Sequence, residues 1–335
     1  MGKIDVSKMG LEFRYLDDKK KDFLQKIADK KPKNSFDLYF SVLSNVVEDA
    51  ERVNGRVWAD FSETMVDVAF LSLKAKSATS LLSYLSIIKD YLVATTEEGD
   101  SLRVGYEYTI KLTREDIKKF INKSCEKYRF VTPKEFNKIL ENEHVDAEAK
   151  ALSLLLYNGV KGTGFKDIID INIDDINLVT GEISKKGKVL TKIDAEYVKY
   201  FEEAISKTEF VVYDVINNDK ITKTMMSYED YENKGLPKCF IRRFVHPSFD
   251  WTIATDQAVI AKRIKDVCKG IENEHLDAQS LYNSGMAYRL LEYCNMELPD
   301  HKRWREFREA TGSKISQMTA ESACRIILDK INKGE

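Results

Sequence analysis

Apolar residues recur at helical spacing along most of this chain of 335 residues. Near the N-terminus, Phe23, Leu24 and Ile27 predict a short helix over residues 17–29. We expect this helix to stop before Pro32, because a proline disfavours helical geometry in the residue that precedes it.

The same spacing continues over residues 36–46 and 81–92, which predicts a compact helical unit. Within this unit, Ser62 stands directly before an apolar run. A serine at that position can cap the first turn of a helix, so we expect a helix over 63–72.

A polar stretch over 95–105 predicts a linker, and a further helix is expected over 112–124. Thr132 followed by Pro133 then predicts a new helix start, since threonine caps helices well and proline suits the first helical position. We therefore expect three parts, namely an N-terminal extension (1–33), a helical domain with its linker (34–127) and a second domain (128–335).

The second domain reads as helices interrupted by one lysine-rich hairpin that ends near Val189. Residues 210–250 show no regular pattern, and the run 276–285 is expected to lead into a helix over 286–293. The sequence thus predicts a mainly α chain with a small β-hairpin or sheet, the further helices being expected over 133–142, 147–158, 194–206, 256–269, 302–311 and 319–330.

Composition narrows the class of protein. No apolar run reaches the roughly 18 residues that a membrane span needs, and the N-terminus lacks the apolar core of a signal peptide. The five cysteines are scattered and never form a CxxC pair, which favours free thiols in the cytoplasm. The four histidines show no zinc-ligand spacing with these cysteines, so we expect no metal and no cofactor.

The formal net charge of −2 is mild evidence against a nucleic-acid partner, but the basic residues are clustered. One cluster opens the helix after residue 73, where lysines, hydroxyls and helix amides together suit a phosphate group. An ordinary solvated helix face explains any single cluster equally well. The candidate phosphate contacts there are Lys74, Lys76, Ser77 and Thr79.

Three stretches resemble the tyrosine recombinase (phage integrase) family. The first is an apolar helix over 152–156 followed by a glycine-rich turn, then DDI at 174–176 and TGEI at 180–183. The second is RFVTPKEF at 129–136, and the third is LDAQSLYNSG at 276–285. The resemblance implies a two-domain clamp around duplex DNA, with a helical core-binding domain and an α+β catalytic-like domain.

The residue types that cleave DNA in that family are missing here. The resemblance places the first arginine at Gly164, with Lys161 or Lys166 as alternatives, and no arginine lies between Val131 and Phe240. A lysine is a poor replacement, because it offers a point charge instead of a bidentate fork. The other positions that the resemblance marks as replaced are Gln279, Tyr282, Asn283, Ser313 and Ser322, the last standing where the nucleophilic tyrosine is expected.

We therefore expect a DNA-binding protein that is not an enzyme. The chain is similar to the lysogeny repressors of SPbeta-like Bacillus phages, which have this fold without recombinase activity. That similarity implies a transcriptional repressor that binds operator-like elements in double-stranded DNA, with a homo-oligomer or a regulatory protein as a further partner. The expected contacts in the second domain are Lys161, Lys166, Lys186, Lys188, Arg242, Arg243, Lys262 and Arg263.

Three alternatives stay open. A divergent integrase could use a displaced nucleophile, and an architectural or recombination-accessory protein could bind DNA without regulating transcription. A helical protein that does not bind DNA stays open because of the net charge of −2. The C-terminal segment 319–330 either folds back onto its own chain or exchanges between protomers.

Overall fold

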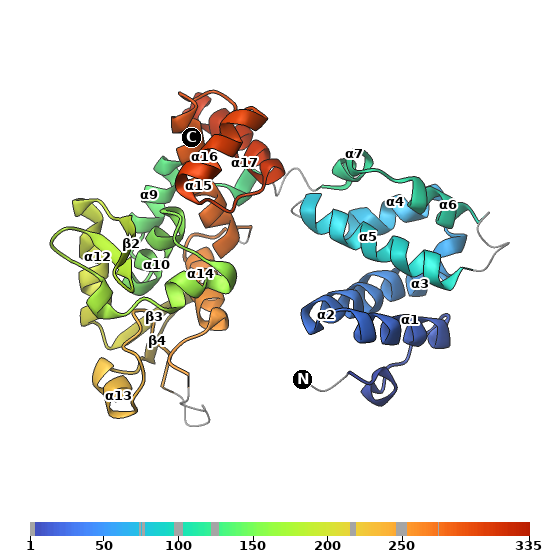
Figure 1. Cartoon of the computed structure of the whole chain (residues 1–335), viewed down its shortest axis with the longest axis horizontal. Helices are drawn as coiled ribbons and strands as arrows, with labels where there is room; N and C mark the ends of the chain where they lie inside the picture. The colour runs from blue at the N-terminus through green and yellow to red at the C-terminus, as the bar shows by residue number, and fades with distance from the viewer. Residues whose placement is uncertain are drawn as a thin grey trace. The chain divides into compact units, whose positions relative to one another are not determined.

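The computed structural model describes residues 4–73, 75, 78–96, 103–121, 127–214, 219–245, 253–273 and 275–335, without the side chains of Ala78, Thr79, Lys118 and Asp214. The chain divides into two compact units, Met1–Glu126 and Lys127–Glu335, here called unit 1 and unit 2 (Figure 1). None of the helices in the described ranges is long and apolar enough to cross a membrane. Four described cysteines are buried thiols, Cys239, Cys268, Cys294 and Cys324.

Unit 1 is helical throughout its described residues. Its helices pack around Trp58, Phe61 and Phe70, which are fully buried. As predicted, Ser62 caps α4, its hydroxyl accepting the amide of Met65 at 3.3 Å. The elements are η1 (Val6–Met9), α1 (Asp17–Lys30), α2 (Lys33–Val42), a π-helical turn η2 (Leu43–Val47), α3 (Glu48–Asn54), η3 (Trp58–Asp60), α4 (Glu63–Ser72), α5 (Ala78–Thr95), α6 (Val104–Lys111), α7 (Arg114–Ile117) and η5 (Lys118–Phe120).

The N-terminal segment belongs to this unit, whereas we expected an extension over 1–33. Phe23 and Leu24 of α1 lie in the same apolar core as Trp58. Lys20 is fully buried, and its ammonium lies 2.6 Å from carboxylate oxygens of both Glu48 and Glu51. A short amphipathic helix cannot bury its apolar face alone, so α1 packs onto α2 and α5.

Unit 2 is built around α10, which is buried over nearly its whole length and packs against α12, α14 and α15. In Figure 1, α15, α16 and α17 gather at one end of this unit, and β3, β4 and α13 lie at the other. The helices are α9 (Pro133–Glu141), α10 (Ala147–Tyr157), η6 (Thr163–Phe165), α11 (Lys166–Ile169), η7 (Ile173–Asp175), α12 (Ala195–Ser206), α13 (Tyr228–Asn233), α14 (Gln257–Gly270), α15 (Ala278–Tyr293), α16 (His301–Thr311) and α17 (Gln317–Asn332).

Two separate antiparallel hairpins complete unit 2, β1 (Glu182–Lys185) with β2 (Lys188–Lys192) and β3 (Glu209–Asp214) with β4 (Asp219–Thr224). The mainly α architecture with a small β component is thereby confirmed. The first hairpin was predicted, but β3, β4 and α13 fall in the stretch that we expected to be irregular. The run 276–285 also differs from expectation, because α15 already begins at Ala278, where Asp277 accepts the amide of Ser280 at 2.7 Å.

The framework residues of that run are packing residues. Leu281, Ser284 and Gly285 are buried in α15. A Cβ added at Gly285 would overlap the carbonyl oxygen of Tyr157. Ser284 Oγ accepts the amide of Val131 at 3.1 Å and donates to the carbonyl of Ser280 at 2.7 Å. These residues therefore fix the close crossing of α15 over α10 and the entry of the chain into unit 2.

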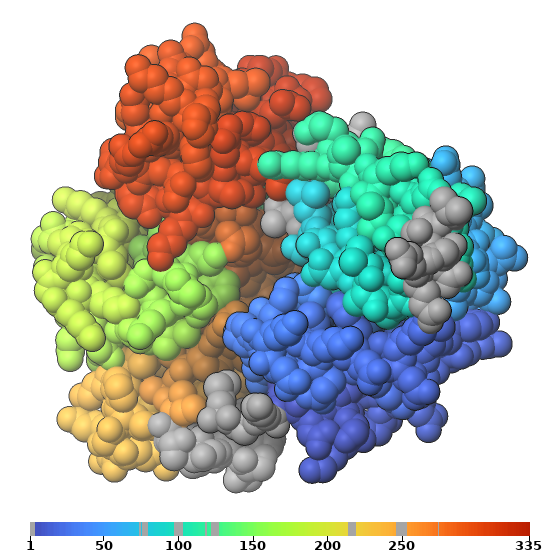
Figure 2. Space-filling model, turned by 45° about the vertical axis from the view of Figure 1, so that its right-hand side comes forward, coloured from blue at the N-terminus to red at the C-terminus, as the bar shows by residue number. Residues whose placement is uncertain are grey.

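The C-terminal helix α17 folds back onto its own unit by packing against α15. Lys330 is buried, and its ammonium donates to the carbonyl of Phe130 and to Glu135 Oε1, both at 2.8 Å. Glu135 also completes a capping box with Thr132, the predicted cap at the start of α9. One ion pair thus joins the two ends of unit 2, and the space-filling view shows the orange-red and red C-terminal segments massed together (Figure 2).

Candidate nucleic-acid interface

Gln279, Tyr282 and Asn283, which we expect to stand in place of catalytic groups, lie together at the start of α15. Lys161, in the turn after α10, donates a hydrogen bond from Nζ to Gln279 Oε1. Gln279 Nε2 donates in turn to Asn283 Oδ1 at 2.8 Å. The Lys161 ammonium also lies 5.2 Å from the centre of the Tyr282 ring. We call this cluster of four contacting side chains the Lys161 pocket, and the structure brings them together from segments more than a hundred residues apart.

The turn before α17 closes the same pocket. The backbone amide of Lys314 donates to the hydroxyl of Tyr282 at 3.0 Å, and Tyr282 is only 4% exposed. Ser313, the neighbouring predicted position, is buried beside it. Ser322 lies half-buried within α17, five residues after that helix begins.

The geometry distinguishes between the alternative positions for the missing arginine. Gly164 has a φ of +61°, a left-handed conformation that side-chain-bearing residues rarely adopt, and a Cβ there would point toward the side chain of Gln257 in α14. Lys161 instead reaches Gln279 and Tyr282. Lys161 is therefore the basic side chain that this turn supplies to the pocket, and Lys166 lies exposed at the start of α11.

Burial lowers the pKa of Lys161. The Asp277 carboxylate opposes this change, and the Lys314 ammonium reinforces it. A half-buried lysine in these surroundings is held less firmly as a cation than an exposed one. The pocket therefore offers a positive charge that depends on pH.

The β1–β2 hairpin carries the next group of lysines. Lys186 and Lys188, here called the tip lysines, are exposed on either side of Gly187. Lys186 and Gly187 both have positive φ, as a two-residue hairpin turn requires. The neighbouring Lys185 turns inward and pairs with Asp167 and Asp170. The structure thus brings the tip lysines next to α11, which begins with the exposed Lys166.

A second basic surface runs along α14, and sequence reasoning found only part of it. Lys262, a predicted contact, is exposed, and its ammonium lies 5.6 Å from the ring centre of Phe244. The Lys223 ammonium of β4 lies 5.1 Å from the same ring. Burial lowers the pKa of Lys223, and the positive charge of Lys262 lowers it further. We call Lys223, Lys262, Lys265 and Lys269 the α14 patch, in which Lys265 and Lys269 are exposed.

Spacing along α14 could have revealed the missed members. Lys262, Lys265 and Lys269 follow one another at helical spacing on the polar face of this helix. Lys223 gives no such signal, because it is placed beside them only by the β3–β4 hairpin packing on α14.

Two of the predicted arginine contacts are instead buried inside unit 2. Arg263 is 0% and Arg242 1% exposed, so neither guanidinium is available to a phosphate in this structure. Arg263 Nε donates to Glu148 Oε1 at 2.8 Å, and its guanidinium packs against the rings of Phe210 and Phe244, 3.8 and 3.9 Å from their centres. Arg242 Nη2 donates to the carbonyls at the end of α12. This burial contradicts the expectation that Arg242 and Arg263 contact DNA.

The Arg243 residue is also buried, with 8% of its surface exposed. Its guanidinium pairs with Asp256, whose other carboxylate oxygen accepts the amide of Val259 at 3.0 Å and so caps α14. Arg243 therefore anchors the start of α14, which contradicts the expectation that it contacts DNA.

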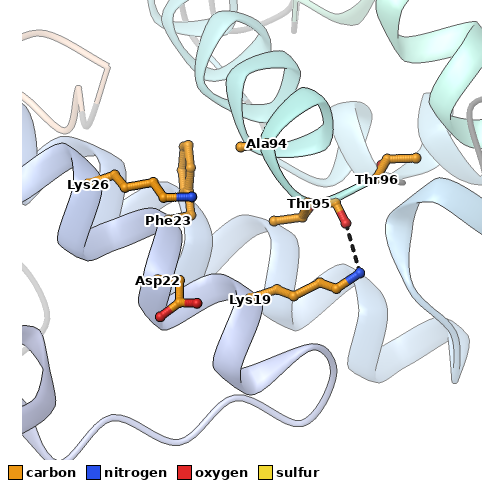
Figure 3. Close-up of a pocket in the computed structure, with 7 residues that line it drawn as sticks. All are labelled: Lys19, Asp22, Phe23, Lys26, Ala94, Thr95 and Thr96. Carbon is orange, nitrogen blue, oxygen red and sulfur yellow. Dashed lines mark hydrogen bonds between the residues drawn. The ribbon is translucent and has the colours of Figure 1, made fainter. Parts of the chain in front are cut away.

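In unit 1, the predicted residues Lys74, Lys76 and Ser77 and the side chain of Thr79 lie outside the described residues. A cavity of about 230 Å³ lies elsewhere in that unit, between α1 and the end of α5 (Figure 3). Its wall combines Lys19 and Lys26 with Asp22, and the Lys19 ammonium already donates to the carbonyl of Thr95 at 3.2 Å. Because the wall carries charges of both signs and Lys19 is already hydrogen-bonded, the cavity favours no single ligand class. Among the described residues, no group of three or more histidines, cysteines or carboxylates is placed to hold a metal ion.

A family model described as the C-terminal catalytic domain of MrpR matches residues 130–301. The chain belongs to the MrpR family. None of the curated proteins matches it. A crystal structure of XerA recombinase is similar over 95% of this chain and 98% of that one, with 11% sequence identity and a TM-score of 0.38, values that carry no argument about function. The matched residues include the Lys161 pocket, the β1–β2 hairpin and the α14 patch, and they end before the 313–314 turn.

Proposed function

We propose that this MrpR-family chain is a sequence-specific double-stranded DNA-binding repressor that maintains phage lysogeny on a recombinase-like scaffold without cutting DNA. The observation that carries the proposal is the set of residue types that form the Lys161 pocket. Where the family resemblance calls for two arginines and a histidine, the pocket holds a lysine, two amide side chains and a buried tyrosine.

Cleavage and binding make different demands on such a pocket. Phosphoryl transfer needs several fixed donors aimed at charge that develops in the transition state. Here the Lys161, Gln279 and Asn283 side chains are bonded to one another. A pocket of this kind suits the holding of a backbone phosphate, which needs charge and hydrogen bonds but no such cage.

The exposed lysines of unit 2 support DNA as the partner. The tip lysines, Lys166 and the α14 patch lie on separate elements and present several ammonium groups to solvent. Such groups supply the salt-dependent part of DNA affinity through counterion release. The acidic residues that bring the net charge to −2 are spread over the whole chain, so the total hides this local excess.

The steps from DNA binding to operator choice, repression and lysogeny rest on the similarity to the lysogeny repressors of SPbeta-like phages. A repressor of this kind binds operator-like elements and is released by a signal or a protein partner. The family assignment is compatible with this role and is silent on which elements are bound.

The rival function is a divergent recombinase, and the description of the family model as a catalytic domain favours it. In a recombinase, Tyr282 would be the candidate nucleophile, because it is the tyrosine beside Lys161. Its hydroxyl is buried and accepts a hydrogen bond from Lys314, a placement that keeps it from an incoming phosphorus atom.

A nicked suicide substrate that traps covalent protein–DNA adducts separates the two functions. We expect no adduct, together with a specific gel shift on intergenic repeats of the phage genome and reduced transcription from a promoter placed next to them. An adduct that disappears in the Tyr282→Phe variant establishes the recombinase and ends the proposal. Specific binding without any change in transcription points to an accessory DNA-binding role and removes the repressor step.

A further inference from the structure

The tip of the β1–β2 hairpin is tied to α11 by Lys185. Its ammonium lies 3.0 Å from Asp167 Oδ1 and 2.9 Å from Asp170 Oδ2, and it also donates to the carbonyl of Lys166 at 3.4 Å. The Lys185 side chain is only 16% exposed. Lys185 with these two carboxylates is called the clasp.

The rest of the hairpin is held in a different way. At its base, the amide of Asn177 donates to the carbonyl of Glu182 at 2.9 Å, and Ile176 bridges to Ile183. The strand register then shifts between Ile183 and Ser184. Backbone pairing to the 172–177 segment therefore fixes the base, while the clasp joins the tip to α11.

Burial alone would lower the pKa of Lys185, but its bonds to Asp170 and Asp167 outweigh burial and raise the pKa. This ammonium therefore stays charged at neutral pH and fully engaged with carboxylates. An ammonium that faces two carboxylates has no surplus charge to offer a phosphate. The tip lysines are exposed to solvent, so Lys185 anchors the hairpin while Lys186 and Lys188 remain accessible to a ligand.

We propose that the clasp positions the tip lysines beside Lys166 for contact with the sugar–phosphate backbone of duplex DNA, and that Lys185 itself touches no phosphate. This inference rests on the proposed DNA-binding function. It makes Lys185, Asp167 and Asp170 positioning residues, which act through the tip lysines.

Charge arithmetic and the clasp predict opposite results for one variant. The side chains of Asp167 and Asp170 are 39% and 31% exposed, on a surface that should face a polyanion. Replacing both with asparagine removes two negative charges at nearly constant shape, so simple electrostatics predicts tighter DNA binding. The clasp predicts weaker binding, because the tip lysines lose their fixed position.

The first measurement is the affinity for duplex DNA as a function of salt. We expect Asp167→Asn/Asp170→Asn and Lys185→Met to weaken binding while leaving the slope of log K against log salt unchanged. Lys186→Ala/Lys188→Ala should lower the slope by about 0.9 per lost phosphate contact. Adding Lys185→Met to that double variant should cause no further loss, because the residues that it positions are gone.

A matched control is Lys192→Met, which removes an exposed lysine at the base of the same hairpin. It should leave the effect of Lys186→Ala/Lys188→Ala unchanged. Tighter binding by the asparagine variant, a lowered salt slope for Lys185→Met, or additive losses in the triple variant each overturn the clasp. If the wild-type chain binds no duplex at all, the DNA-binding proposal itself falls, and the role of the clasp falls with it.

A second measurement needs no DNA. Amide hydrogen exchange over residues 185–189 should speed up in Lys185→Met and in the asparagine variant, and should stay at the wild-type rate in Lys192→Met. The single variants Asp167→Asn and Asp170→Asn provide milder versions if the double change unfolds unit 2. Unchanged exchange in all clasp variants refutes the tether even in a chain that binds DNA well.

Discussion

Replacing Arg263 with methionine should destabilise unit 2 strongly. The change removes the 2.8 Å hydrogen bond to Glu148 and the 2.8 Å hydrogen bond to the carbonyl of Arg242. Methionine keeps apolar contact with the two rings that the guanidinium packs against, so little cavity is left. The cost lies in Glu148, a buried carboxylate whose remaining cation is Arg242, with Nε at 3.8 Å.

Removing one partner of a buried ion pair typically costs about 3–5 kcal/mol. Because Arg242 stays nearby, we expect a loss near the lower end, about 3 kcal/mol. For a domain of this size, each kcal/mol lowers Tm by about 2–4 °C, so the expected drop in the unit 2 transition is about 6–12 °C. Calorimetry of the whole chain measures it, since each unit can show its own transition.

Lys262→Met is the matched control, because it makes the same substitution at the exposed neighbouring position and should change stability by no more than about 0.5 kcal/mol. The double variant Glu148→Leu/Arg263→Met removes the stranded charge as well, so its loss should be clearly smaller than the sum of the two single losses. Equal Tm values for Arg263→Met and Lys262→Met, or simple additivity in the double variant, would refute the reasoning.

Three further outcomes are expected. Gly285→Ala should lower the free energy of unfolding of unit 2 by about 1–3 kcal/mol or more, because the new Cβ overlaps the Tyr157 carbonyl oxygen. Urea unfolding measures this loss, and wild-type stability would show that the helix crossing can relax. DNA affinity should fall on raising the pH sooner than exposed lysines explain, because burial lowers the pKa of Lys161, and Lys161→Arg should abolish this fall in a binding titration. The lowered pKa also means that the folded state binds this proton less firmly than the unfolded chain, so unit 2 should gain stability as pH rises from the folded pKa toward that of a free lysine. In the α14 patch, Lys262→Ala/Lys265→Ala should lower the salt slope of DNA binding by about 0.9 per contact, whereas Lys302→Ala on α16 should leave it unchanged.

Helix starts were predictable because their signals are local. Thr132, Pro133 and Glu135 form a capping box that can be recognised from four consecutive residues. The β3–β4 hairpin was missed because β4 has almost no buried side chains, so its sequence shows no alternation of apolar and polar positions. Its partner β3 then gave too short a signal to stand alone.

The misplaced arginines show where local reasoning fails. A guanidinium is assigned to the surface by default, and only the tertiary structure brings Glu148 to Arg263 across more than a hundred residues. A weaker signal was nevertheless available, since Arg263 falls in phase with Ile260, Ile264 and Val267 on the buried face of α14. Grouping the pocket residues was easier, because Gln279, Tyr282 and Asn283 share two turns of one helix.

The crossing of α15 over α10 also bears on how proteins are sorted into families. A pattern anchored on Leu281, Ser284 and Gly285 detects two helices that touch. It is insensitive to the residue types at 279, 282 and 283, which decide the chemistry. Chains that share the crossing can therefore receive one common label while their pockets differ. Under the proposed function, the shared crossing marks where a DNA phosphate is held, and the side chains around Lys161 decide whether its ester bond is cleaved.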